Sequence, residues 1–129
     1  MISVNMFVSD TKKALEFYKF VFGAIPIEEK LETNPGERSA RFKIGESRFA
    51  LADENPNWES QSPITLGGNP IVIQLTVTNL KETLQKLLKK DSILITPSTE
   101  ENPIINIVPD KQFANIKDPF GHIWTLSNF

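Results

Sequence analysis

The sequence predicts an α+β protein built from two tandem βαβββ modules, whose curved mixed sheets surround a cavity. Two observations carry this prediction. The order strand, helix and three strands occurs twice, and a shift of 69 positions places Val8 on Val77 and Asp10 on Asn79. The segment between the repeats is rich in Pro, Gly, Ser and Asn, which is typical of a connection. We therefore expect a single domain over 1–129, with modules at about 1–54 and 70–129 and a linker at 55–69.

The first module begins with "ISVNMFV", in which apolar residues alternate with other residues as in a half-buried strand. A helix follows in "SDTKKALEFYKFVFG", where Asp10 or Thr11 can cap the start and Gly23 is a stop signal. Three further strands are expected at 25–31, 40–44 and 47–53.

The second module repeats this plan. Its first strand is "PIVIQLTV", which again alternates, and its helix lies in "TNLKETLQKLLKK" with Asn79 and Glu82 spaced as a capping box. Leucines at helical spacing form the apolar stripe of this helix. Strands are expected near 93–96, 104–108, 112–117 and 122–127.

Composition excludes several classes of function. The chain has 129 residues, a formal net charge of −2 and no cysteine. The charge gives no reason to expect nucleic acid or a membrane as a partner, and the missing cysteines exclude disulfides, zinc–thiolate sites and thiol nucleophiles. The first residues, "MISVNMFVSD", have neither a charged leader nor a long apolar run. A cytoplasmic location is the resulting expectation.

Two motifs carry a resemblance to a known family. The stretch "ALEFYKFVFGA" after the first strand and "DPFGHIW" before the last one resemble the vicinal oxygen chelate superfamily, in particular its PhnB-like branch. That superfamily includes glyoxalase I, extradiol dioxygenases and bleomycin-resistance proteins. The resemblance covers nearly the whole chain and implies the repeated βαβββ fold and a homodimer.

The resemblance also implies where a metal would bind. Metal-dependent members hold a divalent ion with two histidines and two glutamates, or close variants, from four strands. The corresponding positions here are Ser3, Val72, Thr125 and a residue within 49–51, where the sequence reads "FAL". A hydroxyl group is a poor ligand by itself for a transition metal. We therefore expect no metal site and no cofactor.

Strand alternation predicts which residues line the cavity. If Ser3 faces inward, so do alternate residues of the paired strands, and the two amides Asn5 and Gln74 become equivalent under the repeat. Either amide can contact a ligand or satisfy a neighbouring protein group. The lining is mostly apolar with neutral hydrogen-bonding groups and one carboxylate, which favours a small, partly apolar organic ligand. The predicted ligand-binding residues are Ser3, Asn5, Phe7, Phe49, Leu51, Asp53, Gln74, Thr76 and Thr125.

The last hairpin and the two tryptophans have structural interpretations. We expect Asp118 to accept hydrogen bonds from backbone N–H groups of its own turn, and His122 to be an exposed or edge imidazole. Trp124 shares a strand face with Leu126 and is expected in the core. Trp58, in the linker, is expected to be buried at the module junction, although it could also cover the cavity.

Three functions follow from these observations. The favoured one is a member without the usual metal ligands that binds or sequesters a small organic molecule. The alternative is a divalent-metal-dependent lyase, isomerase or dioxygenase-type enzyme with a displaced ligand set such as Asp53, Glu54 and His122. The third is a structural or interaction protein whose cavity is filled by its own side chains.

Overall fold

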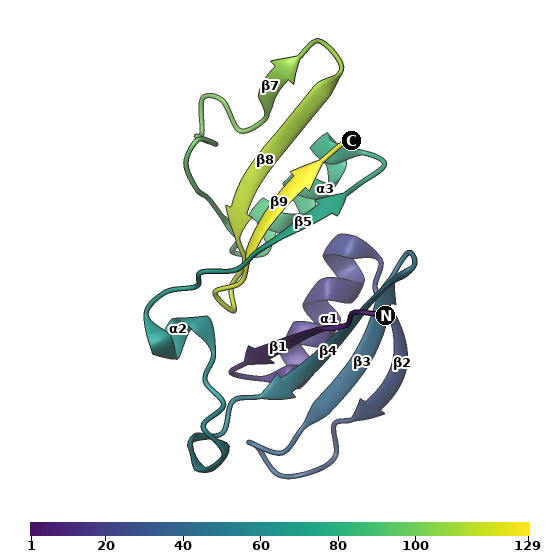
Figure 1. The fold of residues 1–129 in the computed structure, drawn as a ribbon, viewed down its shortest axis with the longest axis vertical. Coiled ribbons are helices and arrows are strands. Elements are labelled where there is room, and N and C mark those ends of the chain that lie inside the picture. The colour runs from purple at the N-terminus through teal and green to yellow at the C-terminus, as the bar shows by residue number, and fades with distance from the viewer. The chain divides into compact units, whose positions relative to one another are not determined.

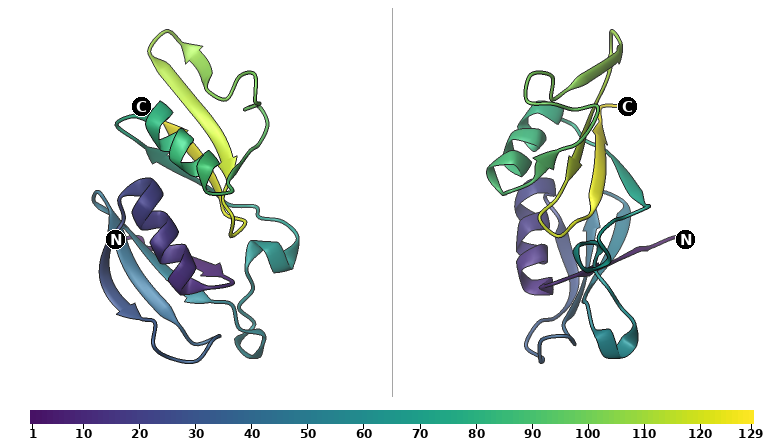
Figure 2. Two further views of the ribbon diagram at one scale, coloured as in Figure 1. Left: turned by 180° about the vertical axis from the view of Figure 1, so that it is seen from behind. Right: turned by 90° about the vertical axis from the view of Figure 1, so that its left-hand side faces the viewer.

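The computed structural model describes residues 1–129, which divide into two compact units, Met1–Gly67 and Gly68–Phe129 (Figure 1). In each unit a mixed sheet carries one longer helix on one face, as the view from behind in Figure 2 shows. The predicted α+β class and its two tandem modules are confirmed. No helix of the structure is both long enough and apolar enough to cross a membrane.

The first unit contains a four-stranded sheet in the order β1-β4-β3-β2. Strand β1 is parallel to β4, and the other neighbours are antiparallel. Two short helical turns follow the sheet. The elements are β1 (Val4–Val8), α1 (Thr11–Phe22), β2 (Ile25–Lys30), β3 (Ser39–Ile44), β4 (Ser47–Asp53), η1 (Pro56–Trp58) and α2 (Pro63–Leu66).

Helix α1 begins and ends where the sequence predicts. The side chain of Asp10 accepts a hydrogen bond from the backbone N–H of Lys13, and Gly23 ends the helix at φ 67°, a left-handed conformation that favours glycine. The buried face of α1 packs on β3 and β4. There the ring of Tyr18 stacks on Phe42 with centroids 5.7 Å apart, and Phe42 stacks on Phe49 at 5.1 Å. This aromatic cluster forms the core of the first unit.

The second unit contains a five-stranded sheet in the order β5-β9-β8-β6, with β7 also paired to β8. Helix α3 is capped by Asn79, whose side chain accepts from the N–H of Glu82, and it packs on β6, β8 and β9. The elements are β5 (Val72–Thr76), α3 (Leu80–Lys89), β6 (Ile93–Leu94), β7 (Ile105–Val108), β8 (Lys111–Lys117) and β9 (Ile123–Ser127).

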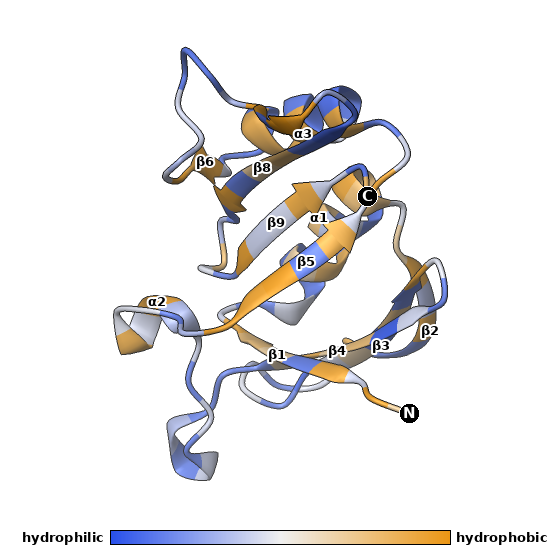
Figure 3. Ribbon diagram, turned by 45° about the horizontal axis from the view of Figure 1, so that its top comes forward, coloured by the Kyte–Doolittle hydropathy of each residue, from blue (hydrophilic) through white to orange (hydrophobic).

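The internal repeat extends to strand register. Asn5 of β1 lies opposite Ala50 of β4, and Gln74 of β5 lies opposite Thr125 of β9. The two amides therefore occupy equivalent positions in their own sheets. In Figure 3 strand β5, with the sequence VIQLT, is hydrophobic along most of its length and hydrophilic in its middle.

The repeat is broken at the outer edge of the second sheet. In the first unit one strand, β2, pairs along β3, but in the second unit two short pieces share the edge of β8. Strand β6 pairs with residues 116–117, and β7 pairs with residues 111–113. Between them, the N–H of Asn115 donates to Ser98 Oγ at 2.9 Å, and Ile95 N–H donates to the carbonyl of Asn115. A loop thus occupies the middle of this edge.

Two expectations about aromatic side chains have opposite outcomes. Trp124 is fully buried, as predicted. Trp58 was expected at the module junction, and this prediction is wrong, because its side chain is 61% exposed. The turn η1 that contains Trp58 is closed by its own hydrogen bonds, from Asn57 N–H to Asn55 Oδ1 and from Trp58 N–H to the carbonyl of Asn55. Its geometry therefore does not depend on burial of the indole.

Candidate functional site

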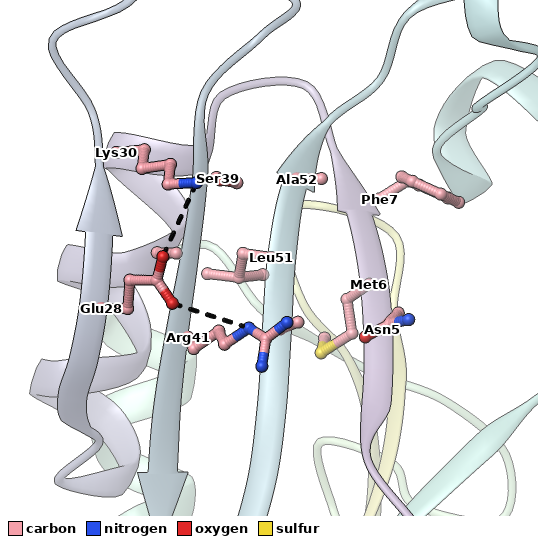
Figure 4. A pocket seen from close by; sticks show the side chains of 11 residues that line it. Asn5, Met6, Phe7, Glu28, Lys30, Ser39, Arg41, Leu51 and Ala52 are labelled. Carbon is pink, nitrogen blue, oxygen red and sulfur yellow. Dashed lines mark ion pairs between the residues drawn. The ribbon is translucent and has the colours of Figure 1, made fainter.

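The first unit carries a pocket on the sheet face opposite α1. Its volume is about 290 Å³. The strand register builds this face from two rows of residues that run across the sheet, with one residue from each strand in each row (Figure 4). The first row is Asn5, Ala50, Arg41 and Glu28, and the second is Phe7, Ala52, Ser39 and Lys30.

Each row contains small side chains, Ala50 in the first row and Ala52 and Ser39 in the second. Ala50 and Ala52 lie on β4, directly opposite Arg41 and Ser39 of β3. Because a methyl or hydroxymethyl group extends little above the sheet, the surface is hollow there. Phe7 supplies an aromatic wall on β1 and is 37% exposed. The pocket therefore offers an apolar floor and wall, with an amide at Asn5 and a hydroxyl at Ser39.

Three charged side chains lie on β2 and β3, at one side of this pocket. Glu28 Oε1 is 3.7 Å from Lys30 Nζ, and Glu28 Oε2 is 3.9 Å from Arg41 Nε (Figure 4). Both distances exceed the range of about 2.7–2.9 Å for a strong charge-assisted hydrogen bond. All three side chains are at least half exposed, so these ion pairs contribute little to stability.

The predicted site residues of the first unit fall into two groups. Asn5 and Phe7 line the pocket, while Ser3 precedes β1, is exposed and is not part of the lining. Leu51 was also predicted, and it borders the pocket. Phe49 and Asp53 were expected on the cavity face, and for these two residues the prediction is wrong, because neither lines the pocket.

The register gives the reason for that error. Phe49, Leu51 and Asp53 pair with Val4, Met6 and Val8, the residues of β1 that alternate with Asn5 and Phe7. The whole set therefore faces α1 and the core, where all three are buried. Leu51 still borders the pocket from within the sheet. Because side chains alternate along a strand, an assignment of β4 that is wrong by one residue places every one of its side chains on the opposite face of the sheet.

Asp53 has a structural environment. Its carboxylate accepts hydrogen bonds from Thr11 N–H and Gly36 N–H, both at 2.8 Å, and from Arg38 Nε at 2.7 Å. Burial alone would raise the pKa of Asp53, but these hydrogen bonds outweigh it and hold the pKa below its usual value. The carboxylate therefore joins the start of α1 to the segment before β3.

The carboxylate of Glu54 also accepts hydrogen bonds that join separate segments of the chain. Its Oε1 accepts from Thr65 Oγ1 at 2.7 Å and from Ser62 N–H at 3.0 Å, at the start of the short helix α2. The hydrogen bond from Thr65, with that from Ser62, lowers the pKa of Glu54. This contact attaches much of the predicted linker to the end of β4.

The open face of the second sheet holds the remaining predicted residues in a hydrogen-bonded network. Thr125 Oγ1 donates to Asn115 Oδ1 at 2.7 Å, and Asn115 Nδ2 donates to the carbonyl of Thr96 at 3.3 Å. Gln74 Nε2 donates to Ser127 Oγ at 3.5 Å, and Thr76 Oγ1 donates to the carbonyl of Phe129 at 2.8 Å. The amide of Gln74 thus has only one long contact within the protein, whereas Thr125 has a short one.

Of the eight residues in the two rows of the pocket, sequence reasoning predicted only Asn5 and Phe7. Glu28, Lys30, Ser39 and Arg41 were not among the predicted residues, although strands β2 and β3 were expected. The signal was present in the segment SARFKI of β3, where Ala40, Phe42 and Ile44 alternate with the other three residues.

The residues present do not fit a divalent metal. The register identifies Ala50 as the equivalent of Thr125, because these residues lie opposite Asn5 and Gln74 in their sheets. The four implied positions thus carry a hydroxymethyl, a methyl, an isopropyl and a threonine hydroxyl, and that hydroxyl already donates its proton to Asn115. Within neither unit do three or more His, Asp or Glu side chains form a group that could hold a metal ion.

The hairpin before β9 is held by a buried carboxylate. Asp118 Oδ1 accepts from Phe120 N–H and His122 N–H, as expected, and Oδ2 accepts from Trp124 Nε1 at 2.9 Å. His122 was expected to be exposed or at an edge, and this prediction is wrong, because the residue is only 8% exposed. The turn brings its backbone back over Asp118, whose N–H donates to the carbonyl of His122 at 2.8 Å.

Comparison with known proteins gives a consistent family match. The model of the Glyoxalase/Bleomycin resistance protein/Dioxygenase superfamily matches residues 1–126. An uncharacterized protein of Mycobacterium bovis is 27% identical over 128 residues, which cover 97% of this chain and 80% of that protein.

Solved structures share the fold at low sequence identity. A gene product of Arabidopsis thaliana has a TM-score of 0.69 at 20% identity, with 98% of this chain and 97% of that one covered. The fosfomycin resistance protein FosX of Listeria monocytogenes, solved with Mn(II) and sulfate, has a TM-score of 0.68 at 14% identity, with coverage of 100% and 91%.

Proposed function

This chain belongs to the Glyoxalase/Bleomycin resistance protein/Dioxygenase superfamily, and we propose that it binds or sequesters a small, partly apolar organic molecule without a resident divalent metal. The observation that carries this proposal is the pocket of the first unit. It is lined by apolar groups from β1 and β4 and by polar groups from β1, β2 and β3. Such a lining favours an organic body oriented by a few hydrogen bonds.

The proposal assigns roles to the residues that were predicted on open sheet faces. Phe7 would pack against the apolar part of the ligand, and Asn5 would donate or accept one hydrogen bond. On the second unit, Gln74, Thr76 and Thr125 are proposed as polar ligand contacts of that unit's own sheet face, with Gln74 the most available because its amide has one contact at 3.5 Å. Phe49 and Asp53 are not proposed as contacts, because they face the core.

The absence of a metal is part of the proposal and rests on the chemistry of the donor set. A divalent ion requires three or four nitrogen, oxygen or thiolate ligands of suitable charge. The FosX structure holds Mn(II), but at the corresponding positions this chain has no imidazole and no carboxylate. The alternative enzyme with Asp53, Glu54 and His122 gains no support from the geometry, because both carboxylates already accept short hydrogen bonds from the protein.

One experiment separates the two functions. Protein purified without chelator is analysed for bound metal, and its melting temperature is measured with Ni²⁺, Zn²⁺, Mn²⁺ and Fe²⁺ and with a panel of small aromatic and aliphatic compounds. We expect no stoichiometric metal, no stabilisation by the ions, and stabilisation by at least one organic compound.

Variants assign the stabilisation to the pocket. Asn5→Leu should reduce the stabilisation by that compound, whereas Asn57→Ala, which removes an exposed amide outside the pocket, should leave it unchanged. A stoichiometric metal whose stabilisation is lost in Asp53→Asn or His122→Ala would refute the metal-free proposal and favour the metal-dependent alternative. If no organic compound raises the melting temperature, binding is refuted and the structural protein with a filled cavity is favoured.

The proposal also covers branch, assembly and location. We propose that the chain is a PhnB-like member that forms a homodimer in the cytoplasm. Light scattering at several protein concentrations tests the assembly, and a mass of one chain at all of them would refute the dimer.

A further inference from the structure

The pocket face of the first sheet has an excess of positive charge. Strand alternation places Arg41 and Lys43 of β3 on the face opposite Phe42, and it places Arg48 of β4 on the face opposite Phe49. Lys30 of β2 joins them, and Glu28 is the only acidic residue in the two rows of the pocket. This excess contrasts with the whole chain, whose formal net charge is −2.

One pair of these positively charged side chains lies where their mutual repulsion destabilises the sheet. Lys43 and Arg48 are directly opposite each other on neighbouring antiparallel strands. Like charges at such positions repel each other and destabilise a sheet. A bound anion on this face would offset that repulsion, so the arrangement favours a negatively charged ligand over a neutral or cationic one.

Two arginines of the same hairpin have different environments. Arg38 has a short contact to Asp53, with Nε at 2.7 Å, and a second to Asp10 with Nη1 at 3.4 Å, and its side chain is only 16% exposed. Arg41 approaches a carboxylate only with Nε, 3.9 Å from Glu28, and its side chain is 70% exposed. Arg38 is therefore held by the protein, while the Nη groups of Arg41 remain available for a ligand.

The neighbours of Arg41 define what else the ligand needs. Figure 4 shows its guanidinium extending over β4, where the residue opposite is Ala50, and beyond it in the same row is Asn5 of β1. Strands lie about 4.8 Å apart, so Asn5 and Arg41 are separated by about 10 Å of sheet with a methyl group between them. Phe7 and Ala52 extend the apolar surface in the next row.

We propose that Arg41 receives the carboxylate of a small organic acid whose apolar body lies over Ala50 and Ala52 toward Asn5. A planar guanidinium with unused N–H groups matches a carboxylate in a bidentate arrangement. The volume of about 290 Å³ limits the body to a small molecule. This inference rests on the proposed binding function and specifies the ligand class for the same pocket.

The test compares acids with their neutral amides. Benzoate, hexanoate and 2-naphthoate, and the three corresponding amides, are titrated into ¹⁵N-labelled full-length protein while backbone amide shifts are followed by NMR. We expect at least one acid to shift the amides of residues 39–41 and 50–52, with an affinity at least about tenfold above that of its amide.

Variants then assign the difference to Arg41. Arg41→Gln should lower the affinity for the acid about tenfold and leave the affinity for the amide unchanged, and Arg41→Lys should have an intermediate effect. Lys12→Gln, which removes one positive charge from the exposed face of α1, should change neither affinity by more than about twofold. Because the side chain of Arg41 is exposed, we expect both variants to fold as the wild type does, and unchanged melting temperatures without ligand verify this point.

Every other outcome overturns the carboxylate assignment, and the outcomes differ in what they say about the proposed binding function. If an acid and its amide bind equally in the pocket, or if Arg41→Gln binds the acid as the wild type does, the binding function stands and the carboxylate assignment is wrong. If none of the six compounds shifts the pocket amides, the carboxylate assignment is wrong, and the metal and wider compound screen decides the binding function separately.

Discussion

Asp53 and Arg38 form a nearly buried ion pair, with Nε of Arg38 2.7 Å from Oδ2 of Asp53 and the carboxylate side chain only 1% exposed. The other oxygen of Asp53 accepts the N–H of Thr11, the first residue of α1. Gly36 N–H donates to the same carboxylate. One side chain at the end of β4 therefore holds the start of the helix and the segment before β3 in place.

We expect Asp53→Asn to destabilise the protein by about 3 kcal/mol, because Arg38 is left without its partner and an amide –NH₂ group faces N–H donors. Urea denaturation measures this change. The control is Asp10→Asn, which removes the weaker ion pair to Arg38 but keeps a good helix cap, and it should cost less than about 1 kcal/mol. Equal effects of the two substitutions would contradict the assigned role of Asp53.

The same carboxylate predicts how stability depends on pH. The pKa of Asp53 is lower in the folded protein than in the unfolded chain, where it is about 3.9. Its contribution is therefore fully present above the unfolded pKa and is lost as the pH falls through the folded pKa. The difference in unfolding free energy between wild type and Asp53→Asn should be constant from pH 7 to about pH 5 and shrink below about pH 4. A difference that stays constant down to pH 3 would refute the lowered pKa.

The two tryptophans give a third prediction. Trp124 is buried and donates to Asp118, whereas Trp58 is largely exposed. Trp58→Phe should leave a blue-shifted emission that acrylamide quenches poorly, with stability within about 0.5 kcal/mol of the wild type. Trp124→Phe should leave a red-shifted, easily quenched emission and cost about 2 kcal/mol, from the lost hydrogen bond and the smaller ring. Similar quenching of the two variants would show that Trp58 is buried in solution.

The sequence was sufficient for the fold because its signals are local and occur twice. Alternation in "ISVNMFV" and "PIVIQLTV" and the caps Asp10 and Asn79 each depend on neighbouring residues alone, and the structure confirms them. The turn at Asp118 is local in the same sense.

The errors arose where contacts join distant parts of the chain. The face of Phe49 and Asp53 depends on the register between β1 and β4, which sequence periodicity does not determine. The strands expected near 93–96 and 104–108 are present as β6 and β7, but their pairing along one edge of β8 was not predicted. The loop between them is held by Ser98 and Asn115, which are 17 residues apart. Arg41 was overlooked for a simpler reason, since alternation was used to predict pocket residues on β1, β4, β5 and β9 and not on β3.

The assignment of sheet faces can itself be tested with matched alanines. Ala50 of β4 lies on the pocket face, and Ala40 of β3 lies on the face covered by α1, where it is 3% exposed. Ala40→Leu should overpack the core and destabilise the protein by about 1–3 kcal/mol. Ala50→Leu adds the same atoms on the open face, so it should change stability by less than about 0.5 kcal/mol.

The order of the two variants should be reversed when ligand binding is measured, with Ala50→Leu the more strongly affected. A leucine at position 50 fills the space opposite Arg41, so Ala50→Leu should abolish the stabilisation by any compound that binds the pocket. Ala40→Leu alters the covered face, so it should retain that stabilisation at temperatures where it is folded. Denaturation curves with and without the compound give both quantities. If Ala50→Leu destabilised the protein as strongly as Ala40→Leu, the face described as open would be part of the packed interior.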